Sequence, residues 1–96
     1  MTFEDFKQTF SGELPPQNLS VHLQALWYDA KGDWQTAHNL IDHLEDRTSA
    51  HVHAYLHRVE GDLWNAGYWY NRAKQPEYQG TLQAEWESLV QMLLEG

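Results

Sequence analysis

The chain has 96 residues, and its 14 acidic residues against six lysines and arginines give a formal net charge of −8. This charge repels phosphate backbones and anionic lipid, so we expect a single acidic domain with no nucleic-acid or membrane partner. The chain has no cysteine, which excludes disulfides and thiolate metal sites, and no apolar run approaches the roughly 20 residues of a membrane span. Because residues 1–5 also lack the basic and apolar start of a signal peptide, we expect a cytoplasmic location.

The first residues predict a short amphipathic helix followed by a linker. Phe3, Phe6 and Phe10 recur at helical spacing, and Thr2 precedes them as an N-cap residue. Two consecutive prolines at positions 15 and 16 cannot continue this helix, so residues 11–17 are expected to form a linker. We expect the three phenylalanines to cover the following helices rather than to anchor the chain in a membrane.

Two further helices are expected over residues 19–31 and 34–44. Gly32 suits the left-handed conformation that often ends a helix, and Asp33 can cap the next helix through its carboxylate. Both helices carry apolar stripes, which predict packing neighbours. The stripes are Leu19, Leu23, Leu26 and Ala30 with Val21, Ala25 and Tyr28 in the first helix, and Trp34, Ala37, Ile41 and Leu44 in the second.

The next part of the chain repeats this pattern. A helix is expected over residues 49–60, with Val52, Leu56 and Val59 on its buried side. A shift of 29 residues superposes this part on the previous one, with matches at Ser20 and Ser49, His22 and His51, Ala25 and Ala54, Gly32 and Gly61, Asp33 and Asp62, and Ala37 and Ala66. The repetition predicts two tandem antiparallel helical hairpins.

A last helix is expected after Pro76 and Gly80. Thr81 can serve as its N-cap, and its apolar face is formed by Leu82, Trp86, Leu89 and Leu93. We expect this helix to seal the open end of the stack of hairpins, as terminal capping elements do in repeat proteins.

The segments Gly32-Asp33-Trp34-x-x-Ala37 and Gly61-Asp62-Leu63-x-x-Ala66 resemble the turn and second helix of the tetratricopeptide repeat, and the resemblance covers residues 18–76. The period of 29 residues is shorter than the usual 34 of that family. Residues 53–70 also resemble small bacterial proteins of unassigned function. The resemblance implies an all-α right-handed superhelix with an N-terminal helix and linker over residues 1–17, hairpins over 18–46 and 47–76, and a capping helix over 77–96.

In the tetratricopeptide family, the first helices of the hairpins form a concave face that binds peptides. Carried over by position, the resemblance implies a face lined by His22 and Asp29 from one hairpin and by His51, Tyr55 and Arg58 from the next. The sequence therefore predicts a non-catalytic protein-binding or peptide-binding module.

Aromatic and basic residues gather in the following helix. Three consecutive rings at positions 68–70 span about 300° of a helix, so at least one of them is not expected to face the core. With Arg58 and Arg72 nearby, Trp64 and Tyr68 suit an acidic or aromatic peptide through cation–π and charge-assisted contacts, so we add them to the predicted binding residues. Two alternatives stay open: these rings pack against the last helix, or they mediate self-association.

The histidines of the helix over residues 49–60 indicate an alternative function. His53 and His57 lie four residues apart on one face and Glu60 follows one turn later, so the three could hold a metal ion in a small-molecule or metal-binding protein. The segment lacks the His-Glu-x-x-His pattern of a zinc protease. The favoured interpretation is a polar seam inside the hairpin, with no metal or cofactor.

Other polar residues give no sign of catalysis. His38 and Asp42 are also four residues apart and are expected to lie on a solvated face. The four serines do not lie in a strand–turn–helix elbow, and no glycine-rich loop is suited to phosphate. We therefore expect that the protein is not an enzyme.

Overall fold

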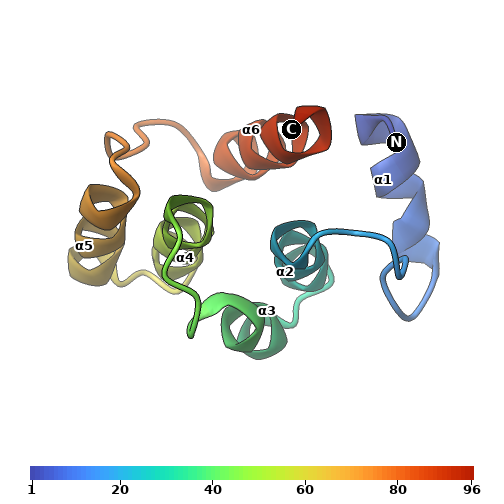
Figure 1. Ribbon diagram of the computed structural model, residues 1–96, viewed down its shortest axis with the longest axis horizontal. Helices are drawn as coiled ribbons and strands as arrows, with labels where there is room; N and C mark the ends of the chain where they lie inside the picture. Colours follow the sequence, from blue (N-terminus) through green and yellow to red (C-terminus); the bar gives the residue numbers. More distant parts are fainter.

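The computed structural model describes residues 1–96 and contains helices and no strand, which confirms the all-α prediction (Figure 1). The elements in chain order are α1 (Phe3–Gln8), the 3₁₀-helix η1 (Thr9–Ser11), α2 (Val21–Ala30), α3 (Trp34–Ile41), α4 (Arg47–Val59), α5 (Leu63–Ala73) and α6 (Leu82–Glu95). None of these helices combines the length and the apolar character that crossing a bilayer requires.

A polar side chain caps the N-terminus of every α-helix and satisfies a backbone N–H that the helix itself leaves unpaired. The caps are Thr2, Ser20, Asp33, Asp46, Asp62 and Thr81. The start of α4 differs from the prediction, because Asp46 accepts hydrogen bonds from both the backbone N–H and the hydroxyl of Ser49, at 3.0 and 2.6 Å. The helix therefore begins at Arg47, and Ser49 is buried in its first turn.

Two glycine turns with the same geometry connect α2 to α3 and α4 to α5. Gly32 and Gly61 have φ angles of 87° and 83°, which side chains with a Cβ atom rarely adopt. The following Asp33 and Asp62 donate their backbone N–H groups to the carbonyls of Tyr28 and His57, both at 2.9 Å, as in a Schellman motif. The Gly-Asp pairs that repeat in the sequence thus form the same helix-ending turn twice.

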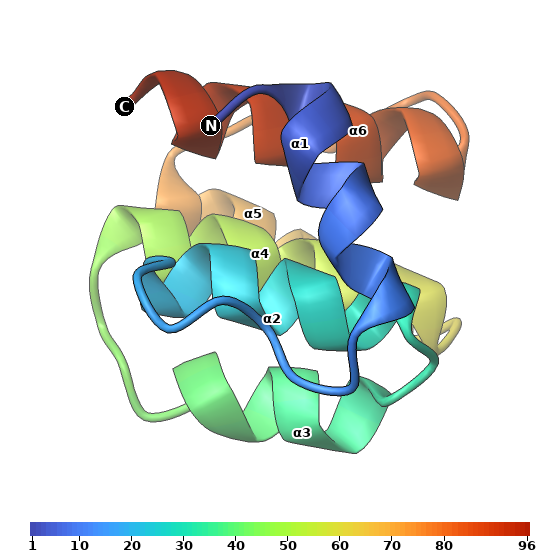
Figure 2. The same ribbon diagram turned by 90° about the vertical axis from the view of Figure 1, so that its right-hand side faces the viewer.

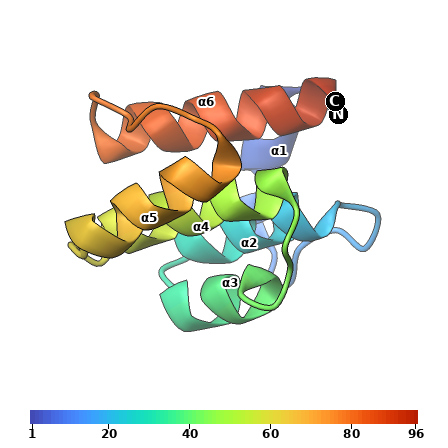
Figure 3. The same ribbon diagram turned by 60° about the vertical axis from the view of Figure 1, so that its left-hand side comes forward.

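The helices are arranged in three layers. Figure 3 shows α6 above the layer of α5, α4 and α2, with α3 below it, and Figure 2 shows α1 beside α6 with the two chain termini near each other. In this arrangement α2 packs against α3, and α4 packs against α5. The main core lies between the layers and includes Phe6, Leu26, Trp27, Ile41, Val52, Leu56, Trp86, Leu89 and Val90.

The last helix lies across α2 and α4 and does not simply close the end of the stack as we expected. Its contacts are with α4, α2 and α1. The Trp86 indole N–H donates to the backbone carbonyl of Leu26 at 3.0 Å, and the ring contacts Phe3, Phe6 and Phe10 of the N-terminal segment. The phenylalanines and Trp86 thus pack together over the α2–α4 layer, and α6 covers the face that the tetratricopeptide resemblance assigns to peptides.

Candidate functional site

Three of the predicted binding residues are engaged inside the protein. Tyr55 is only 4% exposed, and its hydroxyl donates to the Asp29 carboxylate at 2.8 Å. Burial raises the pKa of Asp29 above its usual value, and the hydrogen bond from Tyr55 partly opposes this change. Arg58 donates to the Glu85 carboxylate at 2.6 Å and to the Gly80 carbonyl at 2.8 Å. Tyr55, Asp29 and Arg58 therefore hold α2, α4 and α6 together.

A shallow pocket persists beside this network. It has a volume of about 400 Å³ and is lined by Lys7, Phe10, Asp29, Ala30, Tyr55, Gln83 and Trp86. Because α1, η1 and α6 together supply four of these residues, the pocket is not the open concave face that we expected.

The two remaining histidines of the predicted face are also partly covered. His22 Nε2 lies 2.8 Å from the Ser49 hydroxyl and 3.4 Å from the Asp46 carboxylate, near the N-terminus of α4. His51 packs edge-on against Tyr70 at 6.2 Å between ring centroids, and burial lowers its pKa.

The outer face of α5 carries the exposed aromatic surface. The exposed fractions of Leu63, Trp64 and Tyr68 are 67%, 78% and 45%. The rings of Trp64 and Tyr68 are nearly parallel, with centroids 6.5 Å apart. The Arg72 guanidinium lies over Tyr68 at 5.9 Å and over Trp69 at 5.2 Å, and it donates to the Tyr68 hydroxyl at 3.1 Å. We call Leu63, Trp64, Tyr68 and Arg72 the α5 surface.

The three consecutive rings of α5 point in different directions, as the helical spacing predicts. Tyr70 is 1% exposed and donates to Glu85 in the core. Trp69 stacks on the His53 ring of α4 at 3.9 Å, while Tyr68 lies on the α5 surface. Only one of the three rings is therefore well exposed.

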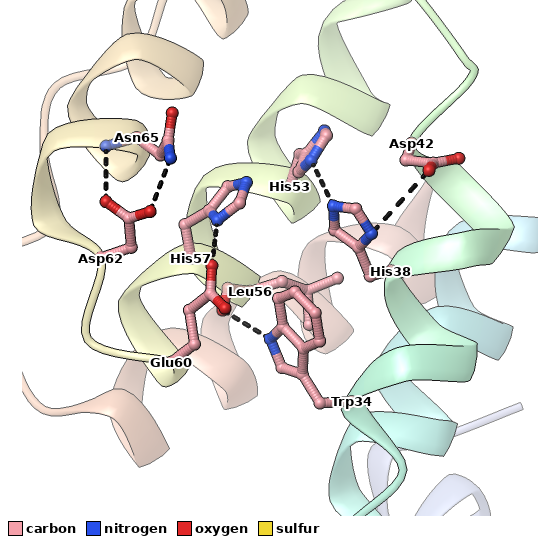
Figure 4. A network of polar contacts seen from close by, with 9 residues as sticks. All are labelled: Trp34, His38, Asp42, His53, Leu56, His57, Glu60, Asp62 and Asn65. Atoms are coloured by element: carbon pink, nitrogen blue, oxygen red, sulfur yellow. Dashed lines mark hydrogen bonds and ion pairs between the residues drawn. The ribbon is translucent and has the colours of Figure 1, made fainter.

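A cluster of three histidines lies between α3 and α4 (Figure 4). His38 of α3 and His53 of α4 face each other with their Nε2 atoms 2.9 Å apart. His57, one turn after His53, stacks on it with ring centroids 4.8 Å apart. One nitrogen of each ring lies within 4.8 Å of the other two, so the three rings converge on one point.

Carboxylates and indole rings orient this histidine cluster. Glu60 accepts a hydrogen bond from His57 Nδ1 at 2.6 Å, and the Asp42 carboxylate lies 3.8 Å from His38 Nδ1. Trp34 stacks on His38 at 4.8 Å between ring centroids and is itself held by a hydrogen bond from its indole to the Leu56 carbonyl. Glu60 thus lies behind His57 and does not form a joint ligand set with His53 and His57.

The placement of His38 corrects the sequence analysis. We expected His38 and Asp42 on a solvated face, but the His38 side chain is only 20% exposed and faces α4. Its spacing of four residues from the apolar Trp34 was the signal for this position, because residues four apart share one helix face.

Burial favours the neutral imidazoles of His38 and His53. It lowers the pKa of His53 from its usual 6.5 to about 4, and the neighbouring His38 and His57 add to this effect. Burial also lowers the pKa of His38, although Asp42 opposes the change. At neutral pH these two rings are therefore uncharged and have a lone pair for a hydrogen bond or a metal ion.

Comparisons of the chain with protein-family models, curated proteins and solved structures find no match. The tetratricopeptide resemblance therefore stays a prediction from the sequence motifs.

Proposed function

We propose that this protein is a non-catalytic module that binds a protein or peptide through the α5 surface. The observation that carries the proposal is the exposure of Trp64, which is 78% exposed beside the half-exposed Tyr68. Folding buries the indoles of Trp27 and Trp86 and gives each of them a hydrogen bond, but it leaves Trp64 largely in water. A partner that covers Trp64 would gain the apolar contact area that folding does not use.

The chemistry of the α5 surface favours an acidic or aromatic partner. Arg72 presents a cation over the rings of Tyr68 and Trp69, and Lys74 follows at the end of the helix. Such a site can pair with a carboxylate and stack on an aromatic side chain at the same time. Trp, Tyr and Arg are also the residue types that dominate binding energy at protein interfaces.

The proposal narrows the set of predicted binding residues. Trp64 and Tyr68 stay in it, and Arg72 joins them because it stacks on Tyr68. Tyr55 and Arg58 are assigned a structural role, since their polar groups bind Asp29 and Glu85.

We further propose that residues 18–46 and 47–76 form two tetratricopeptide-like antiparallel hairpins of a right-handed superhelix in a cytoplasmic protein. Two observations support this proposal: the glycine turns share one geometry, and α2 with α3 and α4 with α5 make the closest helix pairs. In this scheme α6 occupies the groove that other members use for peptides, which moves binding to α5.

A selection from random peptides displayed on phage tests the α5 surface. We expect the enriched peptides to combine an acidic residue with an aromatic one. Affinity for Trp64→Ser should fall about 30-fold or more, because a buried interface Trp contributes at least ~2 kcal/mol. Leu14→Ser is the matched control, since Leu14 is 74% exposed in the linker between η1 and α2. Figure 1 shows that this linker lies on the side of α2 away from α5.

Two results would contradict this proposal. Equal affinity of the selected peptides for the wild type and for Trp64→Ser would place binding elsewhere. Light scattering that shows a dimer of the wild type but a monomer of Trp64→Ser would identify a second copy of the chain as the occupant of the surface.

A further inference from the structure

The geometry of the histidine cluster points to a metal site: we propose that His38, His53 and His57 bind one divalent transition-metal ion, with zinc as the best-suited metal. The site joins α3 to α4 and does not include the α5 surface. This ligand set differs from the one that the sequence suggested, His53, His57 and Glu60, because His38 replaces Glu60 as the third ligand.

The separations of the three rings fit an ion after small movements. Zinc binds imidazole nitrogen at about 2.0–2.1 Å, so two nitrogens of a tetrahedral site lie about 3.3 Å apart. The two Nε2 atoms of His38 and His53 are 2.9 Å apart, and all three donor atoms lie within 4.8 Å of one another. A slight opening of the first pair and a rotation of His57 would bring the three nitrogens to bonding distance.

The groups around the rings favour metal binding over a simple hydrogen bond. Glu60 accepts the Nδ1–H of His57 at 2.6 Å, which leaves its Nε2 atom as the metal-binding nitrogen. Asp42 lies on the Nδ1 side of His38, and the Nε2 atom of His38 points to His53. A carboxylate behind a ligating imidazole is the usual partner arrangement of metal-bound histidine, because it sets the tautomer and raises the basicity of the ring.

The indole rings fix the orientation of two of the ligands. Trp34 stacks on His38 at an interplanar angle of 12°, and Trp69 stacks on His53 at 19°. Ligands held in this way lose little rotational freedom when the ion binds, which favours affinity.

The ligand types decide which metal is expected. Three imidazoles without a thiolate suit Zn²⁺, Cu²⁺ or Ni²⁺ rather than Mg²⁺ or Ca²⁺, which prefer oxygen. Three protein ligands leave a fourth tetrahedral position, which water would fill at the edge of the cluster where His38 is 20% exposed.

A second group of residues is an alternative metal site. His57, Glu60 and Asp62 also lie close enough together to share an ion. Asp62, however, caps α5 by accepting hydrogen bonds from the backbone N–H and the side-chain amide of Asn65. Glu60 is bonded to His57, so both carboxylates of this group already have partners.

Calorimetric titration of the untagged, chelator-treated protein with Zn²⁺ tests the proposal. We expect one ion per chain. His38→Gln should weaken binding at least tenfold, because one of three ligands is lost, and Glu60→Gln should weaken it 10–100-fold through the orientation of His57. His43→Gln is the matched control and should bind as the wild type does, because His43 lies just after α3 with a side chain 69% exposed.

A spectroscopic measurement keeps the test independent of stability. Circular dichroism first establishes that His38→Gln is folded, and Co²⁺ then replaces Zn²⁺ so that its visible absorption reports tetrahedral nitrogen ligands. The proposal is overturned if the wild type takes up no stoichiometric ion. It is also overturned if folded His38→Gln binds with wild-type affinity, since the ion would then lie at His57, Glu60 and Asp62 or elsewhere on the surface.

Discussion

The buried carboxylate of Glu85 is expected to contribute more to stability than any other single polar group. Glu85 is 1% exposed and binds the Arg58 guanidinium, at 2.6 Å, and the hydroxyl of the buried Tyr70. Glu85→Ala removes both interactions and leaves the Tyr70 hydroxyl and the Nη1 atom of Arg58 without these partners. Loss of one partner of a buried ion pair costs about 3–5 kcal/mol. Arg58 keeps its bond to the Gly80 carbonyl, so we expect the lower part of this range, about 3–4 kcal/mol.

The isosteric substitution Glu85→Gln removes the charge of the side chain and keeps its shape. Its amide oxygen can still accept one hydrogen bond, so we expect a smaller loss of about 1–3 kcal/mol. Urea unfolding followed by tryptophan fluorescence measures both variants. At a slope of about 1–3 kcal/mol per M, the midpoint of Glu85→Ala should fall by about 1–4 M.

An acidic residue on the same helix provides the control. Glu95 is exposed at the end of α6, so Glu95→Ala should change the free energy of unfolding by less than about 0.5 kcal/mol. A free energy of unfolding for Glu85→Ala within about 1 kcal/mol of the wild type would show that the position of α6 does not depend on this ion pair.

Other predictions concern the titration of the buried His53 and the two residues Gly32 and Lys74, which both have a positive φ angle. Because burial lowers the pKa of His53 from 6.5 to about 4, the unfolded chain binds more protons in this window and stability must fall as the pH falls through it. With full burial the free energy of unfolding would fall by about 3 kcal/mol, and screening by solvent near the cluster reduces this loss to about 2 kcal/mol. The free energy of unfolding of His53→Gln should depend less on pH, and equal pH dependence of the variant and the wild type would contradict this assignment. Gly32→Ala should cost about 1–2 kcal/mol by strain at φ 87°, whereas Gly12→Ala, at φ −87°, should cost little; equal costs in thermal unfolding would count against this. Lys74 has a φ of 61° at the end of α5, so Lys74→Gly should raise the free energy of unfolding by about 0.5–1 kcal/mol, and a decrease would disprove the assigned strain.

The helices could be predicted from the sequence because their signals are local. The Gly-Asp pairs at positions 32–33 and 61–62 encode both turns within a few residues, and Thr2 and Thr81 encode caps in the same way. Helix periodicity also indicated many of the buried residues of α2, α3 and α4, but it missed Trp27, which is 1% exposed, and it assigned the exposed Ala30 to an apolar face of α2. Each of these features depends on neighbours no more than one or two turns away.

The position of α6 could not be predicted, since it depends on contacts between residues far apart in the chain. Trp86 bonds to the carbonyl of Leu26, and Glu85 bonds to Arg58. No periodicity within α6 specifies these partners. The same limit applies to Tyr55, which the resemblance placed on an open face but which α6 covers in the structure.

The candidate sites were predictable only in part. Helical spacing within α5 indicated that at least one ring is exposed, but it left open that Trp64 and Tyr68, which are exposed in the structure, pack against the last helix. The meeting of His38 with His53 depends on how α3 docks on α4, and that docking is a tertiary property.

We propose that the partner binds at the α5 surface. An NMR titration of ¹⁵N-labelled protein with a peptide selected on the wild type tests it most directly, because each indole N–H gives its own signal. We expect the largest shift at the Trp64 indole and at the amides of Tyr68 and Arg72. Largest shifts at Asp29 and at the Trp86 indole, beside the pocket between α1, α2 and α6, would contradict it.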